Sequence, residues 1–491
     1  MVRVALPQVR VQTLRATSGR GHTSFGGEHV KTKKFSKKPR AKVDPLALPA
    51  IRPDVAGIDI GSKEHWVAAP PAPDGTPNVR RFGTTTDQLH ALADWLKEQG
   101  VTSVAMESTH VYWIPLYELL ESRGIEVLLV NARQLHHTPG RKTDVSDCQW
   151  LQVLHRCGLL RGSFRPSEAI SRIRALQRQL ANLVAERTRC VQWMQQALDQ
   201  MNVQVHRAVS DLTGVTGMAI VRDIVAGQRE PERLAQHRDA RCGKSAEELA
   251  RHLVGNWREE HLFNLASALR LYDAYGVELE SYEGRIAKEL EALESADRRE
   301  QAVPQHPNRI KETAIRGRGE QATRTRLWRV AGVDLTRIDG IGATVAQVVI
   351  SEVGTDFSPF PTEKHFVSWL RLSPPRSISG GKLLKKRRNS VGASRIAAAL
   401  RMAATAVRRS KSALGAAYRK LARRKGATVA VFAIARKLAQ YVYRMMRYGQ
   451  DYVDIGEQEY ERRHLKQRLH SLQETARALG YKLVTPEPSP T

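Results

Sequence analysis

The order of extended and helical patterns between residues 55 and 131 constrains the fold of this chain more than any other feature of its sequence. VAGIDI at 55–60 is a short apolar run between a proline and a glycine, which predicts a buried strand. The segments that follow are extended at 65–70 and 79–82, helical at 86–99, extended at 102–108, helical at 111–123 and extended at 125–131. Three strands followed by alternating helices and strands predict an α/β domain built on one sheet.

Acidic residues fall on three elements of this predicted domain. The order of its elements is typical of a ribonuclease-H-like fold, in which the first and fourth strands lie side by side. The acids are Asp59 on the first strand, Glu107 at the end of the fourth, and Asp144 and Asp147 on the final helix. Such a fold would gather four carboxylates into one cluster.

The last two of these acids lie three residues apart at the start of an amphipathic segment, RKTDVSDCQWLQVLHRCGLL at 141–160. On a helix, Asp144 and Asp147 share a face, with Cβ atoms about 5–6 Å apart. At an effective dielectric near 20, two carboxylates about 5 Å apart repel by roughly 3 kcal/mol. Water, the neighbouring Arg141 and Lys142, or a bound cation could offset this cost. A plain helix N-terminus also favours Asp, so the pair alone leaves the choice open.

Four carboxylates in one cluster have a specific chemical use. Phosphoryl transfer needs divalent ions that polarise the phosphate, and two ions about 3.5–4 Å apart need several carboxylates to hold them. A single Asp in a strand turn is more often structural. Four acids on the expected elements of one fold instead predict a site for divalent metal ions.

The charge of the chain predicts a polyanionic partner. Its 491 residues carry 78 Lys and Arg against 50 Asp and Glu, a formal net charge of +28. Counterion release from a nucleic acid would then supply much of the affinity.

The length predicts about three domains. Residues 1–52 are rich in Lys and Arg and nearly free of acids, which predicts a disordered basic arm.

The cysteines and the hydropathy pattern bear on location. Cys148, Cys157, Cys190 and Cys242 occur in no CxxC or zinc-like spacing, which is typical of reduced thiols in a cytoplasmic protein. No apolar run approaches the ~18 residues needed to cross a membrane, and the N-terminus lacks the pattern of a signal peptide. We expect a cytoplasmic protein that is not associated with a membrane.

Three sequence blocks carry a resemblance to a known family: GIDIGSKEHWVA, AMESTHVYW and GRKTDVSDCQWLQVLHRCGLLRGSFRP. They resemble the catalytic domain of the DEDD-type transposases of the insertion sequence 110 family, a RuvC-like domain shared with Piv-type DNA invertases. The resemblance covers roughly residues 54–166 and places the domain at 53–166. It implies that the catalytic, metal-binding tetrad consists of Asp59, Glu107, Asp144 and Asp147.

Long amphipathic helices are predicted for residues 167–296. Apolar residues at three- and four-residue spacings run through 173–201, broken only by Arg187, and a matching series runs through 265–286. Two such stretches can pair as an antiparallel or an intersubunit coiled coil, which is a structural role without chemistry. Residues 297–330 show little periodicity and predict a linker or a flexible basic segment.

A C-terminal transposase domain is predicted at 331–455. In its first segment, LTRIDGIGATVAQVVISEVG, Gly340 and Gly342 precede a helix, a pattern similar to a helix-hairpin-helix motif. Such a turn can bring backbone N–H groups to a phosphate without reading sequence, although a tight turn before a packed helix is the alternative. Basic, Ala-rich helices at 408–449 are typical of faces that follow a phosphate backbone, and a solvated basic surface would look the same. The tail at 456–491 predicts a charged helix and then disorder.

A serine in the block HFVSWLRLSPPRSISGGKLLKKRRNSVGASRIAAAL is a candidate nucleophile. Ser379 precedes two glycines among basic residues, an arrangement that also suits an ordinary phosphate-binding loop. The block resembles the C-terminal domain of the same family, and this resemblance implies that Ser379 attacks a DNA phosphodiester and forms a covalent phosphoserine. Ile378 departs from the polar residue that often precedes this serine in the family. We expect nucleic-acid contacts from Lys142, Gly340, Gly342, Arg376, Gly380, Lys382, Lys385, Lys386, Arg387 and Arg388.

Together with these features, the resemblance implies a DNA transposase or recombinase of an insertion sequence, in a bacterial cytoplasm and associated with the nucleoid. We expect the Mg²⁺ site and the serine to form a composite active site between subunits of a homodimer or homotetramer. The resemblance also implies a structured noncoding guide RNA (bridge RNA) that pairs with donor and target DNA. The alternatives are a metal-dependent Holliday-junction-type nuclease, a site-specific DNA invertase and a non-catalytic nucleic-acid-binding protein.

Overall fold

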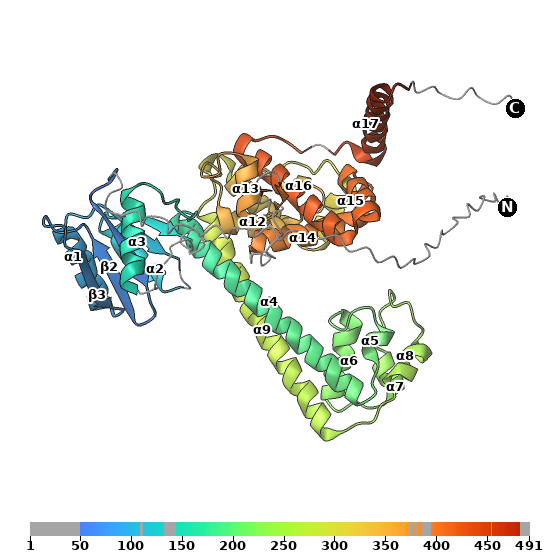
Figure 1. The fold of residues 1–491 in the computed structure, drawn as a ribbon. Helices are drawn as coiled ribbons and strands as arrows, with labels where there is room; N and C mark the ends of the chain where they lie inside the picture. Colours follow the sequence, from blue (N-terminus) through green and yellow to red (C-terminus); the bar gives the residue numbers. More distant parts are fainter. Residues whose placement is uncertain are drawn as a thin grey trace, which may run out of the picture. The chain divides into compact units, whose positions relative to one another are not determined.

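The computed structural model describes residues 50–108, 111–131, 144–373, 378–379, 382–383, 394–452 and 454–481. The chain divides into two compact units, residues 1–163 and 164–491 (Figure 1). Most of the predicted basic arm lies outside the described residues. Its predicted end at residue 52 is too late, because the backbone N–H groups of Ile51 and Arg52 both donate to the carbonyl oxygen of Arg156 at 3.0 Å.

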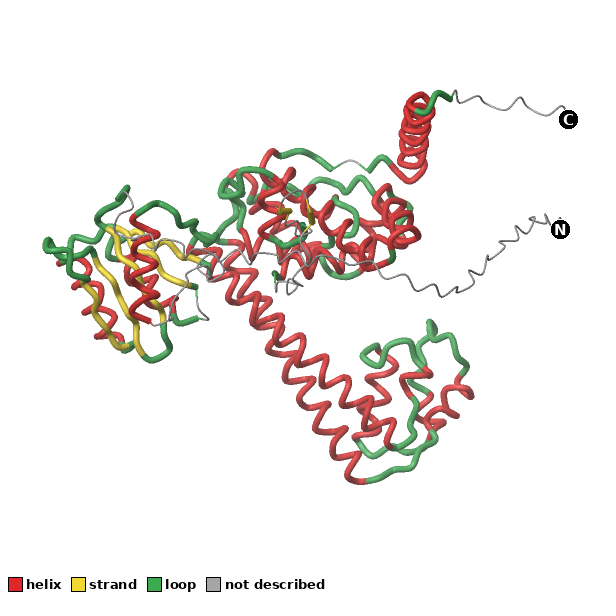
Figure 2. Tube along the Cα trace, viewed as in Figure 1, coloured by secondary structure: helices red, strands yellow, loops and turns green. Residues whose placement is uncertain are grey.

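The first unit is built on one mixed sheet of five strands in the order β3-β2-β1-β4-β5 (Figure 2). β1 is antiparallel to β2 and parallel to β4, which confirms that the first and fourth strands are neighbours. This arrangement fits a ribonuclease-H-like domain. The strands are β1 (Val55–Ile60), β2 (Glu64–Ala69), β3 (Asn78–Gly83), β4 (Ser103–Glu107) and β5 (Glu126–Val130).

Helices cover both faces of this sheet. They are α1 (Thr86–Glu98), α2 (Trp113–Ser122) and α3 (Asp144–Arg156). Leu92 and Leu96 of α1 and Leu116 of α2 share one apolar core with Ile58 of β1. α3 packs on the other face, where Gly57 of β1 is in contact with its backbone.

The end of α3 is anchored to the sheet by a buried polar contact. The Oγ atom of Ser103 in β4 lies 2.9 Å from Nε2 of His155, and both side chains are buried. Burial lowers the pKa of His155 to about 4, so the imidazole is neutral at ordinary pH. This neutral pair fixes the position of the end of α3 along the sheet.

Two long helices dominate the second unit, α4 (Glu168–Gln200) and α9 (Glu259–Glu291), which lie side by side (Figure 1). They are antiparallel, because residues near the start of α4 share a core with residues near the end of α9, and the reverse holds at the other end. Of the two arrangements that the heptad spacing allowed, the structure has the antiparallel pair within one chain. Arg187 interrupts the apolar series because its guanidinium lies over the ring of Tyr272, 4.1 Å from the centroid.

A small helical domain closes the far end of this pair. Its helices are α5 (Val205–Ala208), α6 (Val215–Val225), α7 (Pro231–Ala235) and α8 (Ala246–Leu253). Their apolar side chains form one core with the end of α4 and the beginning of α9.

The C-terminal part of the second unit is helical, in agreement with the sequence prediction. Its helices are α10 (Arg309–Gly317), α11 (Gln321–Ala331), α12 (Ala343–Val353), α13 (Glu363–Trp369), α14 (Arg395–Ala406), α15 (Ala413–Lys425), α16 (Ala427–Tyr448) and α17 (Gly456–Ala478). Short elements complete it: the 3₁₀ helices η3 (Ala296–Arg298), η4 (Leu335–Arg337) and η5 (Val407–Arg409), and the strands β6 (Ile378–Ser379) and β7 (Lys382–Leu383). α16 runs through the core between α13, α14 and α15. No helix in the described part of the chain combines the length and the apolar character that crossing a membrane would require.

The prediction of a linker at 297–330 is wrong. Residues 309–331 form α10 and α11, and Leu327 and Val330 belong to the main core of the unit. The sequence misled because Arg324, which looks like a solvent-exposed cation, is only 1% exposed and forms an ion pair with Asp334. A buried ion pair removes the polar-to-apolar contrast on which periodicity depends.

Candidate active site and nucleic-acid interface

The ends of two neighbouring strands hold the first two predicted acids. Ile58 of β1 is paired in parallel register with Met106 of β4, so Asp59 and Glu107 are the next residues along each strand. Ile58 and Met106 face the apolar core beneath α1 and α2. Because side chains alternate along a strand, both acids belong to the opposite face, which carries α3.

A glycine brings α3 close to that face. A Cβ atom at Gly57 would lie only 2.3 Å from the carbonyl oxygen of Cys148 and 2.3 Å from the backbone nitrogen of Gln152. Any other residue at this position would push the helix away from β1. The local sequence therefore places the first turns of α3, which contain Asp147, beside the strand end that carries Asp59.

The pKa of the Cys148 thiol depends on burial and on two of the predicted acids. Burial raises its pKa to about 12, and the nearby carboxylates of Asp59 and Asp147 act in the same direction. Both acids therefore lie within electrostatic reach of one buried sulfur atom. The thiol stays protonated and donates a hydrogen bond to the carbonyl oxygen of Val145 at 3.2 Å.

The groups at this end of the sheet suit a hard divalent cation. The predicted donors are carboxylate oxygens, which Mg²⁺ and Mn²⁺ prefer, and the adjacent sulfur is a protonated thiol, which is a poor ligand. α3 begins at Asp144, whose side chain is not described, and Lys142 lies outside the described residues. Among the described side chains, no group of three or more His, Cys, Asp or Glu is arranged to hold a metal ion. The four-carboxylate site thus stays a prediction.

The candidate nucleophile lies in a short hairpin of the second unit. β6 and β7 are antiparallel, with Ser379 paired with Lys382 and Ile378 paired with Leu383. The backbone positions of Ser379 and Lys382 are thus neighbours across the hairpin, while their side chains are not described. The remaining basic and glycine residues predicted for this block lie outside the described residues: Arg376, Gly380, Lys385, Lys386, Arg387 and Arg388.

The two glycines of the predicted helix-hairpin-helix precede α12. Gly340 has φ +84°, and a Cβ atom there would lie 2.8 Å from the carbonyl oxygen of Ala403 in α14. Gly342 is the N-cap residue of α12. Packing against α14 by itself accounts for Gly340, so the expected phosphate contact at this turn is not confirmed.

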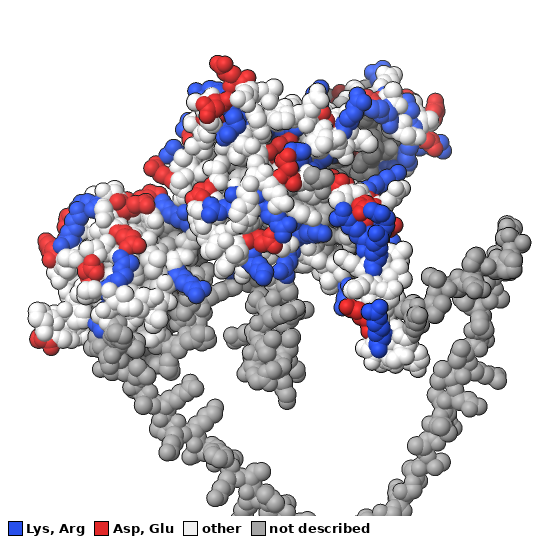
Figure 3. All heavy atoms as spheres, turned by 90° about the horizontal axis from the view of Figure 1, so that it is seen from above, with Lys and Arg blue, Asp and Glu red and all other residues white. Residues whose placement is uncertain are grey.

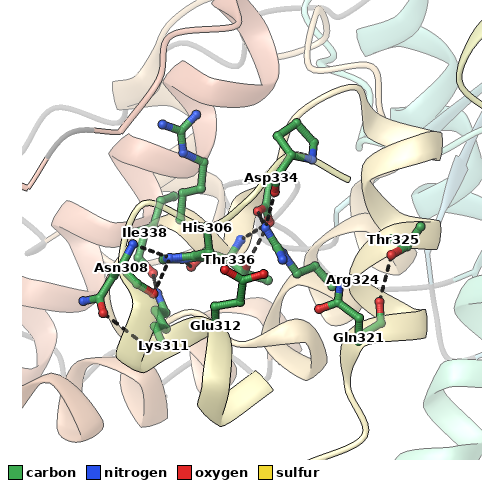
Figure 4. A network of polar contacts seen from close by, with 12 residues as sticks. His306, Asn308, Lys311, Glu312, Gln321, Arg324, Thr325, Asp334, Thr336 and Ile338 are labelled. Carbon is green, nitrogen blue, oxygen red and sulfur yellow. Dashed lines mark hydrogen bonds and ion pairs between the residues drawn. The ribbon is translucent and has the colours of Figure 1, made fainter. Parts of the chain in front are cut away.

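A network of buried polar contacts lies next to this turn (Figure 4). Arg324 donates two hydrogen bonds to one carboxylate oxygen of Asp334, at 3.0 and 2.7 Å. The Nζ atom of Lys311 donates to the carbonyl oxygen of Ile338 at 2.6 Å, and burial lowers the pKa of Lys311 to about 8. His306 accepts a hydrogen bond from the backbone N–H of Asn308 at 2.9 Å. Sequence reasoning missed these residues because most of them lie in the supposed linker.

Several cations of the described surface lie close together where α15 and α17 meet. We call the following residues the α15–α17 cation cluster: Lys420, Arg423, Arg424, His464 and Arg468. Partial burial and then repulsion by Arg468 and Arg424 lower the pKa of Lys420, and burial followed by the charge of Lys420 lowers that of His464. The one acid recorded among these interactions is Glu461. Figure 3 shows Lys and Arg side chains gathered in groups on one face of the molecule, with groups of acids among them.

Two comparisons with known proteins cover these regions. Residues 56–203 match the family model of the DEDD transposase domain of the IS110 group, described as "Transposase", and residues 333–419 match the one described as "Transposase IS116/IS110/IS902 family". No curated protein matches the chain. The first match spans the four predicted carboxylates, and the second spans the β6–β7 hairpin and the turn before α12.

Proposed function

Because this chain belongs to the IS110 family of insertion-sequence transposases, which are enzymes that act on DNA, we propose that it cuts and rejoins DNA with two sets of groups. The first set comprises carboxylates of the ribonuclease-H-like domain, and the second is a serine of the C-terminal domain. The single observation that carries the proposal is the pressing of α3 onto β1 at Gly57, next to the strand ends that hold Asp59 and Glu107.

In this proposal the metal-binding residues are Asp59, Glu107, Asp144 and Asp147. The DEDD type of domain implies dependence on a divalent metal, and we propose Mg²⁺, with two ions. When bound, such ions stabilise negative charge on phosphate oxygens. The chain would contribute the placement: sheet register puts Asp59 and Glu107 at neighbouring strand ends, and the close approach of α3 brings its first turns, which carry Asp147, toward Asp59.

The serine supplies a covalent step. We propose that the Oγ atom of Ser379 attacks the phosphorus of a DNA phosphodiester. One P–O bond forms to Oγ, one P–O bond to the DNA breaks, and the released strand end takes a proton and becomes a hydroxyl. A hydroxyl of the other DNA partner then attacks the phosphoserine, which restores the serine and rejoins the DNA without an external energy source. Basic residues close in sequence, such as Lys382 opposite Ser379 in the hairpin, would stabilise the charge that develops.

Recognition of the two DNA partners is assigned to a structured noncoding RNA. We propose that base pairing with this RNA selects donor and target, while the protein binds phosphate backbones through sequence-independent contacts. The α15–α17 cation cluster supports the backbone contacts of this proposal, because, besides burial, its like charges lie close enough to lower the pKa of Lys420 and of His464. Assembly as a homodimer or homotetramer is part of the same proposal.

A denaturing gel tests the serine step. The protein is incubated with labelled DNA carrying the element's ends and with RNA transcribed from the noncoding DNA that flanks its reading frame. We expect a covalent protein–DNA adduct that is lost in Ser379→Ala, while RNA binding persists. Ser373→Ala is the matched control, since Ser373 lies in the same block and should leave the adduct unchanged. DNA ends that are cut but carry no protein would indicate hydrolysis by a junction nuclease and would refute the serine mechanism.

The metal site needs a separate test. Asp59→Asn keeps the size of the side chain and removes its charge, so the fold is expected to persist while Mg²⁺-dependent cleavage falls by at least about a hundredfold. Cleavage that is unaffected by this change and by chelators would place the chemistry elsewhere. Loss of both DNA binding and folding would point to a structural role for Asp59.

A further inference from the structure

α17 differs from the other long helices in having no buried side chain. It begins at Gly456, beyond residue 419 at which the second family match ends. Its apolar residues are nevertheless regularly spaced, at intervals of four, three, four and three. They are Leu465, Leu469, Leu472, Ala476 and Leu479, and the four leucines are 59%, 45%, 50% and 68% exposed. We call this row the leucine stripe.

The leucine stripe has the geometry of one specific kind of contact. Alternating spacings of three and four residues place side chains on one seam of a coiled coil, at the a and d positions of the heptad. Single exposed leucines are common on protein surfaces, whereas a continuous apolar row marks an interaction site. The stripe therefore fits another helix lying along α17.

α15 does not occupy this seam. The residues of α17 that interact with α15 are Glu457, which pairs with Arg419, and three residues close to Lys420. Those three are Glu461, His464 and Arg468. The spacing from Glu457 to Arg468 defines a neighbouring face of the helix. Within the described part of the chain, the leucine stripe is exposed to solvent along its whole length.

We infer that the leucine stripe pairs with the α17 helix of a second copy of this chain, as a parallel two-stranded coiled coil. With Leu465 and Leu472 at d positions, Glu461 is at a g position and Lys466 is at the following e position. In a parallel pair a g residue faces the e residue five positions later in the partner helix, so Glu461 of each copy faces Lys466 of the other. An antiparallel pair would set Lys466 against e positions instead, where Gln473 offers no charge. Self-complementarity of charge thus selects both the partner and the orientation.

The polar residue before the stripe sets where the apolar seam begins, and the Glu461–Lys466 pairs flank the first layer of that seam. Arg462 occupies the a position preceding Leu465, and its guanidinium is bonded to Glu459 of the same helix at 2.7 Å. The seam therefore extends from Leu465 to Leu479, about two heptads. Such a short coiled coil is weak by itself, and it acts together with other contacts of the assembly. Pairing here would place two α15–α17 cation clusters next to one another.

Cysteine cross-linking of the full chain is the deciding test, and it involves neither Ser379 nor the predicted metal site. In a parallel pair the two Leu465 positions face each other, so Leu465→Cys should link two copies under mild oxidation. Gln467→Cys is the control, because position 467 points away from the seam. Mixing Leu465→Cys with Ala476→Cys should give no additional cross-link, since these d and a positions meet only in an antiparallel pair. Absence of the link in Leu465→Cys overturns the proposal, whatever other interfaces hold copies together.

A charge series adds a quantitative readout. Replacing both Leu469 and Leu472 by Lys places like charges on the seam and should raise the dissociation constant of self-association roughly tenfold or more in sedimentation experiments. The control variant, Gln467→Lys with His470→Lys, adds the same charge on the outer face and should leave it unchanged. The double leucine variant is also cross-linked at 465, and loss of that link supports the pairing. If the leucine variant instead lowers the stability of the monomer and cross-linking is absent, the stripe is covered by another part of its own chain and the proposal fails.

Discussion

The ribonuclease-H-like domain and the C-terminal helical domain fix their polar groups by different means. In the first, backbone geometry does the placing: the register of β1 and β4 sets Asp59 beside Glu107, and Gly57 admits α3. In the second, charge does the placing, because Arg324 and Asp334 are buried as an ion pair beneath the turn that leads into α12. Groups placed by backbone geometry should respond to changes in size, and groups placed by ion pairs should respond to changes in charge.

The largest effect is expected from Gly57→Val. Its Cβ atom would overlap backbone atoms of α3 at 2.3 Å, and these cannot move without displacing the helix. We expect the unfolding free energy of the N-terminal domain to fall by about 4 kcal/mol, the upper end for single substitutions. Metal-dependent cleavage should be lost, because a shift of about 1 Å costs on the order of a hundredfold. Thermal unfolding and cleavage assays measure the two effects.

Gly83→Ala is the matched control for this change. Gly83 belongs to the same sheet, but a Cβ atom there would meet only side-chain atoms of Gln88, the nearest being Cγ at 3.1 Å, and this flexible side chain can move. We expect stability within about 1 kcal/mol of the wild type. Equal damage from both glycine changes would contradict the idea that the approach of α3 is what matters.

The next largest effect is expected from Arg324→Met in the C-terminal domain. The change keeps the approximate volume but leaves the Asp334 carboxylate, which is 7% exposed, without its cation. Breaking a buried ion pair from one side costs about 3 kcal/mol or more. Arg326→Met on the same helix is the control, because its partner Glu291 is half exposed and such surface pairs contribute about 0–1 kcal/mol. Chemical denaturation of both variants would show whether charge burial separates them.

Lys311 allows the same contrast to be sharpened by pH. Burial lowers its pKa from the usual 10.5 to about 8 in the folded state, against the attraction of Asp339 and Asp334. Below pH 8 both the folded and unfolded states carry the proton, so stability does not depend on this group. Between pH 8 and 10.5 the unfolded state binds more protons, so stability should rise with pH by up to about 1 kcal/mol per unit.

Lys311→Met should remove that rise. Denaturation curves measured from pH 7 to pH 10 on both proteins isolate the contribution of this one group from those of other titrating residues. Lys288→Met on the exposed face of α9 is the control and should leave the pH dependence as in the wild type. A rise that persists in Lys311→Met would show that the ammonium group is well solvated.

The difference between placement by backbone geometry and placement by buried charge also explains which parts of the fold could be predicted from the sequence. The strands and the two long helices follow from hydrophobic periodicity, which depends on each side chain having one environment. Periodicity left open whether the helices pair within one chain or between subunits. The segment around Arg324 defeats this reasoning because a charged residue lies in the core, and its partner ten residues later has no local signature. The predicted carboxylate site is only partly described, and no described feature tests the role of Ser379. Gly57, which the sequence analysis did not single out, could have been noticed as a glycine inside a strand, which often marks close backbone approach.

The smallest expected effect concerns the α15–α17 cation cluster, where charges are gathered on the surface and not buried. Replacing Lys420 and Arg424 by Gln removes two cations that repel their neighbours, so stability should stay the same or rise slightly. If both residues contact phosphates, the slope of log binding constant against log salt should become less negative by about 2, for DNA or for RNA. The nucleic acid whose slope changes is the one that the cluster binds.

A variant with the same net charge separates a local contact from a general loss of positive charge. Arg172→Gln with Arg285→Gln also removes two cations, both of which pair with Glu289 on the α4–α9 helices. Long-range attraction should weaken equally in the two variants, and it is screened over about 8 Å at physiological salt. Only a direct phosphate contact changes the salt slope at high ionic strength. If the slopes of the two variants still differ above about 0.15 M salt, which is about the physiological value, the contact is assigned to α15 and α17. Identical slopes would mean that this surface is solvated and that the nucleic acid binds elsewhere on the chain.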